Sequence, residues 1–136
     1  EHNLWTTKNY ELVESRLDEQ LFMGWGTFDK GILSGRVTEE RKFDSSDARS
    51  WAPWWSRKEV AIKLAKMEKL KTLLNFHRLE LASFSLNYAL STRKPVCSLI
   101  GFKSIDDLDK ILTSLNNNIS EDFIHKIYDD WINLSN

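Results

Sequence analysis

The segment LFMGWGTFDKGILSGR, from Leu21 to Arg36, decides how the rest of the chain is interpreted. Its first five residues are apolar and have the length of a buried strand. Gly26 and Gly31 follow, with Lys30 between them. An aromatic residue and two close glycines at the end of a strand fit a flat ligand that carries a phosphate, but they also fit an ordinary tight turn.

The size and composition of the chain narrow the possible functions. Its 136 residues, 41% hydrophobic and 29% charged, suit one globular domain. The 19 basic and 20 acidic residues leave a net charge of −1, which gives no electrostatic support for a nucleic-acid or membrane-surface partner. The single cysteine, Cys97, cannot form an internal disulfide, which suits a reducing compartment. We therefore expect a cytoplasmic protein that binds neither nucleic acid nor membrane.

Apolar periodicity predicts strands that alternate with helices. Buried strands are expected over Leu21–Trp25 and over PVCSLIG, which starts at Pro95, and Glu1–Trp5 is predicted to be a short extended piece. Helical spacing predicts helices over residues 10–20, 57–75 and 79–90. Ser104 and Ser120 each precede a pair of acidic residues, as the N-caps of two further helices would. Residues 37–56 are predicted to form a long loop.

Each of the three later helices is expected to bury one apolar stripe. The predicted stripes are Val60, Leu64, Met67, Leu70 and Leu74 in the first; Ile105, Leu108, Ile111, Leu112 and Leu115 in the second; and Phe123, Ile127 and Trp131 in the last.

This order of elements indicates an α/β fold with parallel strands. About three strands are too few for such a sheet, because helices normally cover both of its faces and its open edges would be a liability. The chain also begins at Glu1, inside what reads as an element. We expect residues 1–136 to be part of a larger domain. We also expect their bare apolar strands to pair with another chain or a second copy.

Both predicted strands end in residues that suit a phosphate. After the first strand, Trp25 offers a flat face for an aromatic ring, and Lys30 follows the glycine. After the second, LIGFKS places Gly101 and Lys103 before a helix N-terminus. A glycine-rich turn with a core tryptophan, and a plain strand-to-helix loop, explain the same residues. Two such strand ends together favour a site, because ligands of parallel α/β proteins bind there.

Other residues that could carry chemistry have ordinary structural explanations. The segment DARSWAPWW, from Asp47 to Trp55, fits a cofactor lid or a partner surface as well as a loop packed on the fold. The nearby basic residues Arg41, Lys42 and Arg49 could reach an anion but are more often solvated. His2, His77 and His125 lack metal-ligand spacing, and Cys97 in an apolar strand is expected in the core.

The ordered set of motifs resembles the aldo-keto reductase family. GWGTFDKGILSGR resembles the family's seventh-strand segment, Y-S-P-L-x-x-G-L-L-T-G. SLIGFKSIDDLDKIL resembles its eighth-strand segment, I-P-G-x-R-S-x-x-Q-L-x-x-N-L, and LELASFSLNYALS is similar to its seventh helix. EHNLW would be the tail of the sixth strand. The resemblance covers nearly the whole chain in the family's order.

The resemblance implies the C-terminal portion of a (β/α)8 barrel, with about three parallel strands, flanking helices and NADP(H) at the strand ends. Trp25 falls where a family aromatic residue stacks on the nicotinamide. The turn after it falls where the family holds the pyrophosphate, and it comprises Gly26, Thr27, Phe28, Lys30 and Gly31. Three later residues fall where the adenosine phosphates bind: Gly101, Lys103 and Ser104.

Two departures qualify this expectation. The family's adenine-side Gln and Asn are Asp107 and Ile111 here, and an acid repels a 2′-phosphate. NADP(H) is the cofactor that the resemblance implies. The acid predicts weaker NADP(H) binding or an altered site and makes NAD(H) the other candidate, whereas Lys103 keeps one basic group in place and argues against complete loss of binding. The family's catalytic Asp, Tyr, Lys and His lie on early strands that these residues do not include. The isolated chain is therefore predicted to be inactive.

Three hypotheses remain open. In the first, the chain is the C-terminal part of an oxidoreductase that transfers a hydride between the dinucleotide and a small carbonyl or alcohol. In the second, it is a non-catalytic dinucleotide-binding or protein-interaction module, with Trp51, Trp54 and Trp55 at a partner surface. In the third, it is an unrelated α/β domain.

Overall fold

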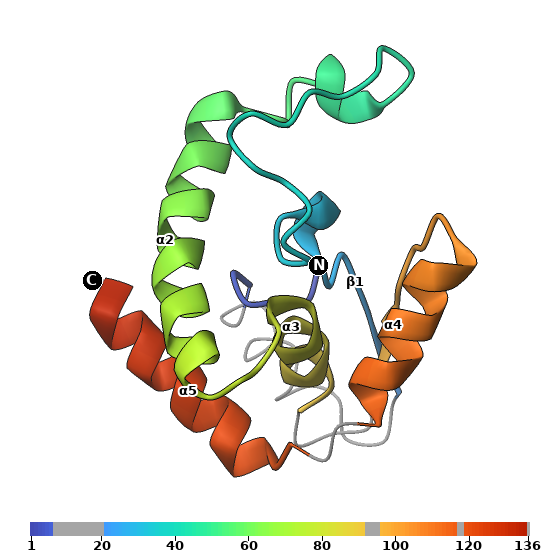
Figure 1. Cartoon of the computed structure of the whole chain (residues 1–136). Helices are drawn as coiled ribbons and strands as arrows, with labels where there is room; N and C mark the ends of the chain where they lie inside the picture. The colour runs from blue at the N-terminus through green and yellow to red at the C-terminus, as the bar shows by residue number, and fades with distance from the viewer. Residues whose placement is uncertain (7–20, 92–95, 117–118, 136) are drawn as a thin grey trace.

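A computed structural model describes residues 1–6, 21–91, 96–116 and 119–135 (Figure 1). The helix expected over residues 10–20 lies outside these described residues. The described elements, in chain order, are β1 (Phe22–Trp25), the short 3-10 helices η1 (Asp29–Gly31) and η2 (Ala48–Ser50), α2 (Arg57–Phe76), α3 (Leu81–Leu90), β2 (Val96–Leu99), α4 (Ile105–Leu115) and α5 (Glu121–Ser135).

The strands β1 and β2 are parallel neighbours, which confirms the prediction of an α/β fold with a parallel sheet. Their register pairs Phe22 with Val96 and Trp25 with Leu99. Both strands therefore end at the same edge of the sheet. Within the described residues the sheet has two strands instead of about three.

The extended piece predicted over Glu1–Trp5 is wrong. The Asn3 side chain accepts a hydrogen bond from the Trp5 amide at 3.0 Å, and the Thr6 amide donates to the Asn3 carbonyl at 3.0 Å. Asparagine often closes a turn in this way, because its side chain competes for nearby backbone groups. The segment still lies beside β1, since the His2 amide donates to the Trp25 carbonyl at 2.9 Å.

The long helix α2 forms as its sequence predicts. The Ser56 hydroxyl caps its start by accepting from the Glu59 amide at 3.4 Å. Arg78, with φ +57°, ends it in a left-handed turn in which the Leu79 amide returns to the Leu74 carbonyl. Of the predicted stripe, four residues are buried and Val60 is half-buried: Leu64, Met67, Leu70 and Leu74.

The hydrophobic core lies among the helices and not at the sheet. Figure 1 shows α2 and α5 on one side of the molecule, α4 on the other, and α3 between them. The buried core residues come from α2, α3, α5, the N-terminal turn and the segment after η1: Leu4, Ile32, Leu33, Val37, Leu64, Met67, Leu70, Leu74, Leu81, Phe84, Tyr88, Ile124, Ile127 and Trp131. On α5 the predicted Ile127 and Trp131 are buried and Phe123 is half-buried.

The prediction that Leu21–Trp25 is a buried strand is wrong within the described structure. Met23 and Trp25 are 53% and 56% exposed, and Gly24 is the buried residue of β1. Cys97 in β2 is half-buried instead of in the core. These side chains would be covered only by elements that pack on the sheet, and the core forms elsewhere.

The buried stripe predicted for α4 is also wrong. Ile105 is 78% exposed, and Leu112 and Leu115 are also exposed. The helix instead buries Asp107 and Ser114, and the Asn87 side chain of α3 donates to the Ser114 carbonyl at 3.0 Å. The polar contact with α3 therefore accompanies a rotation of α4 that leaves Ile105, Leu112 and Leu115 exposed and Leu108 and Ile111 half-buried.

Candidate functional site

The carboxyl ends of β1 and β2 bring the two predicted phosphate-binding segments to one edge of the sheet. Trp25 and Leu99 are register partners, so the turn that begins at Gly26 and the segment that begins at Gly101 leave the sheet side by side. The hydroxyls of Thr27 and Ser98 lie 2.5 Å apart and join the two segments. This edge is the candidate site.

Trp25 ends β1 with its side chain 56% exposed. Its backbone is held from the N-terminal turn, where His2 donates to its carbonyl. The next carbonyl, of Gly26, accepts from the Asn3 side chain at 2.9 Å. The indole is thus carried by a fixed backbone while keeping an open surface, which is what stacking on a planar ligand requires.

The turn after β1 has an unusual backbone. Gly26 and Gly31 have φ of +73° and +100°, and the non-glycine residues Asp29 and Lys30 have φ of +41° and +57°. Left-handed non-glycine residues cost roughly 1–3 kcal/mol each, so surrounding contacts must hold them. Here the Arg49 guanidinium donates to the Lys30 carbonyl at 2.7 Å.

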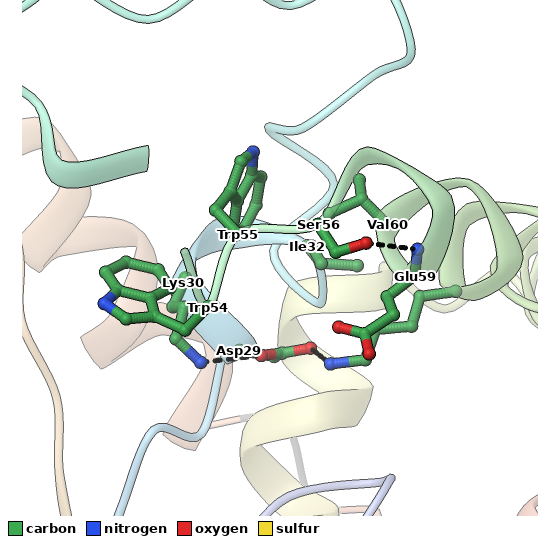
Figure 2. Close-up of a pocket in the computed structure, with 9 residues that line it drawn as sticks. Asp29, Lys30, Ile32, Trp54, Trp55, Ser56, Glu59 and Val60 are labelled. Atoms are coloured by element: carbon green, nitrogen blue, oxygen red, sulfur yellow. Dashed lines mark hydrogen bonds and ion pairs between the residues drawn. The ribbon is translucent and has the colours of Figure 1, made fainter. Parts of the chain in front are cut away.

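Asp29 lies almost fully buried beneath this turn. The Lys63 ammonium from α2 reaches its carboxylate at 2.5 Å, and the Lys30 ammonium lies 3.5 Å from its other oxygen. Figure 2 shows Asp29 and Lys30 close together beside Trp54, and the Lys30 ammonium lies 5.3 Å from that ring's centroid. Lys30 also pairs with Glu1 at 3.2 Å. Its charge is therefore shared among internal partners.

At the second segment, Asp107 organises the start of α4. The Ser104 hydroxyl accepts from the Asp107 amide at 3.1 Å, which confirms Ser104 as the N-cap. The Lys103 amide donates to the Asp107 carboxylate at 3.2 Å. The Lys103 and Asp107 amides, at the helix start that the sequence predicted to suit a phosphate, thus bind groups of the chain itself.

Arg36 binds Asp107 with both arms of its guanidinium. Its Nη1 donates to Oδ2 at 3.0 Å, and its Nη2 donates to Oδ1. This paired hydrogen bond holds the pKa of the Asp107 carboxyl well below its usual range and raises the pKa of Arg36. Asp107 therefore carries a full negative charge at neutral pH.

The long loop also reaches this edge. Asp47 binds Arg49 at 2.9 and 2.6 Å, which holds the pKa of Asp47 well below its usual range. The Lys103 ammonium lies 3.8 Å from Asp47, and its side chain is 80% exposed. The expectation that Arg49 is solvated is wrong, whereas Arg41 and Lys42 are exposed. Lys103 is thus a basic group of this edge, with its ammonium near Asp47 and its side chain open to solvent.

The predicted site residues lie on two segments that leave the sheet side by side. The turn after β1 carries Trp25, Gly26, Thr27, Phe28, Lys30 and Gly31, and the segment after β2 carries Gly101, Lys103 and Ser104. The sequence did not predict the ion pairs that join distant segments, Arg36 with Asp107 and Lys63 with Asp29. The signal in the sequence for Arg36 was its positive charge directly after Ser34 and Gly35, at the end of the segment Leu21–Arg36.

The described residues also bear on metal binding and on membrane crossing. Across residues 1–6, 21–91, 96–116 and 119–135, no group of three His, Cys, Asp or Glu side chains is placed to hold a metal ion. Over the same ranges, no helix is both long enough and apolar enough to cross a membrane.

Comparison with known proteins identifies the family. The sequence pattern of the aldo/keto reductase family matches residues 7–130. The chain belongs to this family. The structure is also similar to that of the glycerol dehydrogenase AKR11B4 from Gluconobacter oxydans, with a TM-score of 0.75 and 20% sequence identity. That likeness shows a shared fold. It covers 98% of this chain and 41% of that chain, so the present chain spans less than half of its solved relative.

A search of curated proteins found no match to the chain.

Proposed function

We propose that this aldo/keto reductase chain forms the C-terminal, dinucleotide-binding part of an oxidoreductase. The whole protein would transfer a hydride between a nicotinamide dinucleotide and a small carbonyl or alcohol. The observation that carries the proposal is the meeting of the Trp25 turn and the Gly101 segment at one edge of a parallel sheet. The similar solved structure is that of a glycerol dehydrogenase, which supports the reaction class.

The residues present at this edge fit a dinucleotide. Trp25 has an exposed indole on a fixed backbone, which suits a nicotinamide ring. Gly26 and Gly31 give the turn that would hold the diphosphate its left-handed backbone, with the Glu1 side chain and the Arg49 guanidinium packed beside these two glycines. Lys103 supplies an exposed positive charge for an adenosine phosphate. A bound nicotinamide would supply or accept the hydride.

The chain's own residues would bind and orient the dinucleotide without taking part in the reaction. The family resemblance implies that the catalytic Asp, Tyr, Lys and His would come from early strands outside residues 1–136. We therefore expect residues 1–136 alone to be inactive. The apolar surface at β1 would be covered by another chain or by a second copy, because Met23 in β1 and Leu21 directly before it are exposed.

The test compares dinucleotide affinities of variants of the full-length gene product by calorimetric titration. Lys103→Ala should weaken NADPH by roughly ten- to a hundredfold, the value of one charged hydrogen bond to phosphate, and NADH much less. Trp25→Ala should weaken both dinucleotides similarly, because both contain nicotinamide. Lys110→Ala is the matched control, since Lys110 is an exposed lysine of α4 that pairs with Asp106.

The outcomes separate the parts of the proposal. An unchanged NADPH/NADH affinity ratio in Lys103→Ala would remove the phosphate role of Lys103. If the unmodified protein binds neither dinucleotide, the oxidoreductase proposal fails.

A second candidate function is a non-catalytic dinucleotide-binding or protein-interaction module. Trp51 and Trp54 are 69% and 51% exposed, and exposed aromatic clusters usually contact something. A Trp51→Ala/Trp54→Ala double variant would lose a protein partner while keeping dinucleotide affinity. Under the oxidoreductase proposal, the same double variant of the full-length protein should keep both its dinucleotide affinity and its activity.

A further inference from the structure

Asp29 is a buried carboxylate at the centre of the turn after β1. It is 2% exposed, and its φ of +41° lies in the left-handed region that non-glycine residues rarely adopt. The Ile32 amide donates to the Asp29 carbonyl at 3.1 Å, and the Gly31 amide donates to the Phe28 carbonyl at 2.9 Å. A strained residue of this kind keeps its conformation only if the contacts around it hold it there.

Lys63 of α2 provides such a contact from outside the turn. Its ammonium lies 2.5 Å from Oδ2 of Asp29 and 5.8 Å from the centroid of the Trp5 ring. The next residue, Leu64, is buried in the hydrophobic core, so the core fixes the part of α2 that carries Lys63. Asp29 and Lys63 line one small cavity (Figure 2). The ion pair therefore ties the strained turn to a rigid helix.

Lys30 does not replace Lys63 as the partner of Asp29. Its ammonium lies 3.5 Å from the carboxylate, pairs with Glu1 at 3.2 Å and lies 5.3 Å from the centroid of the Trp54 ring. Without Lys63, the Asp29 carboxylate would remain buried with one more distant partner, and a buried charge without a close partner is costly. The carboxylate would relieve this cost by turning toward water or by drawing Lys30 inward. Either movement changes the backbone of the turn.

We propose that Lys63 is a positioning residue of the candidate site, which neutralises Asp29 and thereby keeps the turn after Trp25 in the shape that binds the dinucleotide. This inference rests on the proposed function and gives Lys63 no contact with the ligand. The effect of Lys63 must therefore be the same for NADH and NADPH. It must also disappear when residue 29 carries no charge.

The test uses the full-length gene product and measures the dissociation constants of NADH and NADPH. Lys63→Gln should weaken both by about tenfold, because it leaves a buried carboxylate without its close partner. The Lys63→Gln/Asp29→Asn double variant should return both constants to within about threefold of those of the unmodified protein, because a neutral pair needs no counter-ion. Lys63→Arg keeps the charge and should retain the affinity for both dinucleotides.

Lys71→Gln is the matched control. Lys71 lies on the same helix and its side chain has the same exposure as that of Lys63, 34%, but it pairs with the exposed Glu68 at 2.7 Å. This control should leave both dissociation constants within about twofold, since an exposed pair contributes little.

A measurement without ligand separates positioning of the turn from general stability. In Lys63→Gln, hydrogen exchange of the Gly31 and Ile32 amides should accelerate more than that of the Met67 and Leu70 amides in the buried part of α2. A purely structural role for Lys63 would accelerate both sets of amides equally, since both would then exchange through unfolding of the whole protein.

The outcomes distinguish this inference from the proposed function. A loss of affinity that the second change, Asp29→Asn, does not restore would overturn the inference, as would a changed NADPH/NADH affinity ratio or equal acceleration of the two sets of amides. If Lys63→Gln does not fold, the double variant decides, because it should fold and bind both dinucleotides. Binding of both dinucleotides with no effect of Lys63→Gln leaves the proposed function intact and ends this inference alone. Binding of neither by the unmodified protein ends both proposals.

Discussion

Gly31 shows how one residue fixes the turn after β1. Its φ is +100°, a conformation that side-chain-bearing residues rarely adopt. A Cβ at this position would also lie 3.2 Å from the Arg49 guanidinium, the group that donates to Lys30. Gly31→Ala should therefore lower the free energy of unfolding by about 1–3 kcal/mol, measured by denaturant titration.

Gly101→Ala is the control for this prediction. Among the residues that the structure describes, no atom lies within 4 Å of the position that a Cβ on Gly101 would take. Its effect on the free energy of unfolding should stay within about 0.5 kcal/mol, as for most surface substitutions. If Gly31→Ala and Gly101→Ala lowered the free energy of unfolding equally, the left-handed backbone of Gly31 would not be the cause of the loss.

The sequence could show local features of the site but not its long-range pairs. Ser104 was recognisable as an N-cap because the pattern that reveals a cap spans a few residues. The pair between Arg36 and Asp107 joins residues 71 positions apart, and nothing in either local pattern reports the other. Asp107 therefore looked like one more acid in a helix first turn, whereas it is buried and bound to a guanidinium.

At the scale of elements, α2 shows a stripe whose burial the sequence predicted well. Met67 lies on this stripe and is fully buried. Met67→Ala should lower the free energy of unfolding by about 2–5 kcal/mol, because it removes packed atoms and leaves a cavity. Ile62→Ala on the same helix should cost far less, since Ile62 is 51% exposed. Denaturant titrations with similar losses for both would contradict the assignment of the buried face.

The helix α4 shows why an equally clear stripe was misjudged. Periodicity reports that Ile105, Leu112 and Leu115 share one face, and all three are exposed. A stripe is buried only if another element covers it, and the element that contacts α4 here, α3, meets its opposite, polar side through Asn87. Amphipathic spacing thus predicted the helix and its apolar face but could not supply the neighbour.

At the scale of the whole molecule, apolar burial is divided unequally. The helices α2, α3 and α5 share one core, whereas the described residues of the sheet and of α4 contribute none of its buried members. A parallel sheet is normally covered on both faces, so its side chains should be apolar on both, as those of β1 are. The apolar side chains of β1 led us to predict a buried strand. They stay uncovered because the core forms on the other side of α3.

This division predicts that the chain associates through its sheet. Leu21 directly before β1, Met23 in β1 and Leu99 in β2 are 63%, 53% and 55% exposed, and burying such a side chain is worth about 1.5–3 kcal/mol. In sedimentation velocity at micromolar concentration, residues 1–136 should form species larger than a monomer. The Met23→Gln/Leu99→Gln double variant should shift them toward monomer.

Phe76→Gln provides the control, because Phe76 is 83% exposed but lies at the end of α2, away from the sheet. If association depended on exposed apolar area in general, Phe76→Gln would reduce it as much as the sheet variant does. A specific sheet interface requires the opposite: the sheet variant dissociates and Phe76→Gln does not. A chain that sediments as a monomer and binds no hydrophobic dye would mean that β1 and β2 do not present the surface described here. The expectation that the sheet pairs with another chain or a second copy would then be wrong.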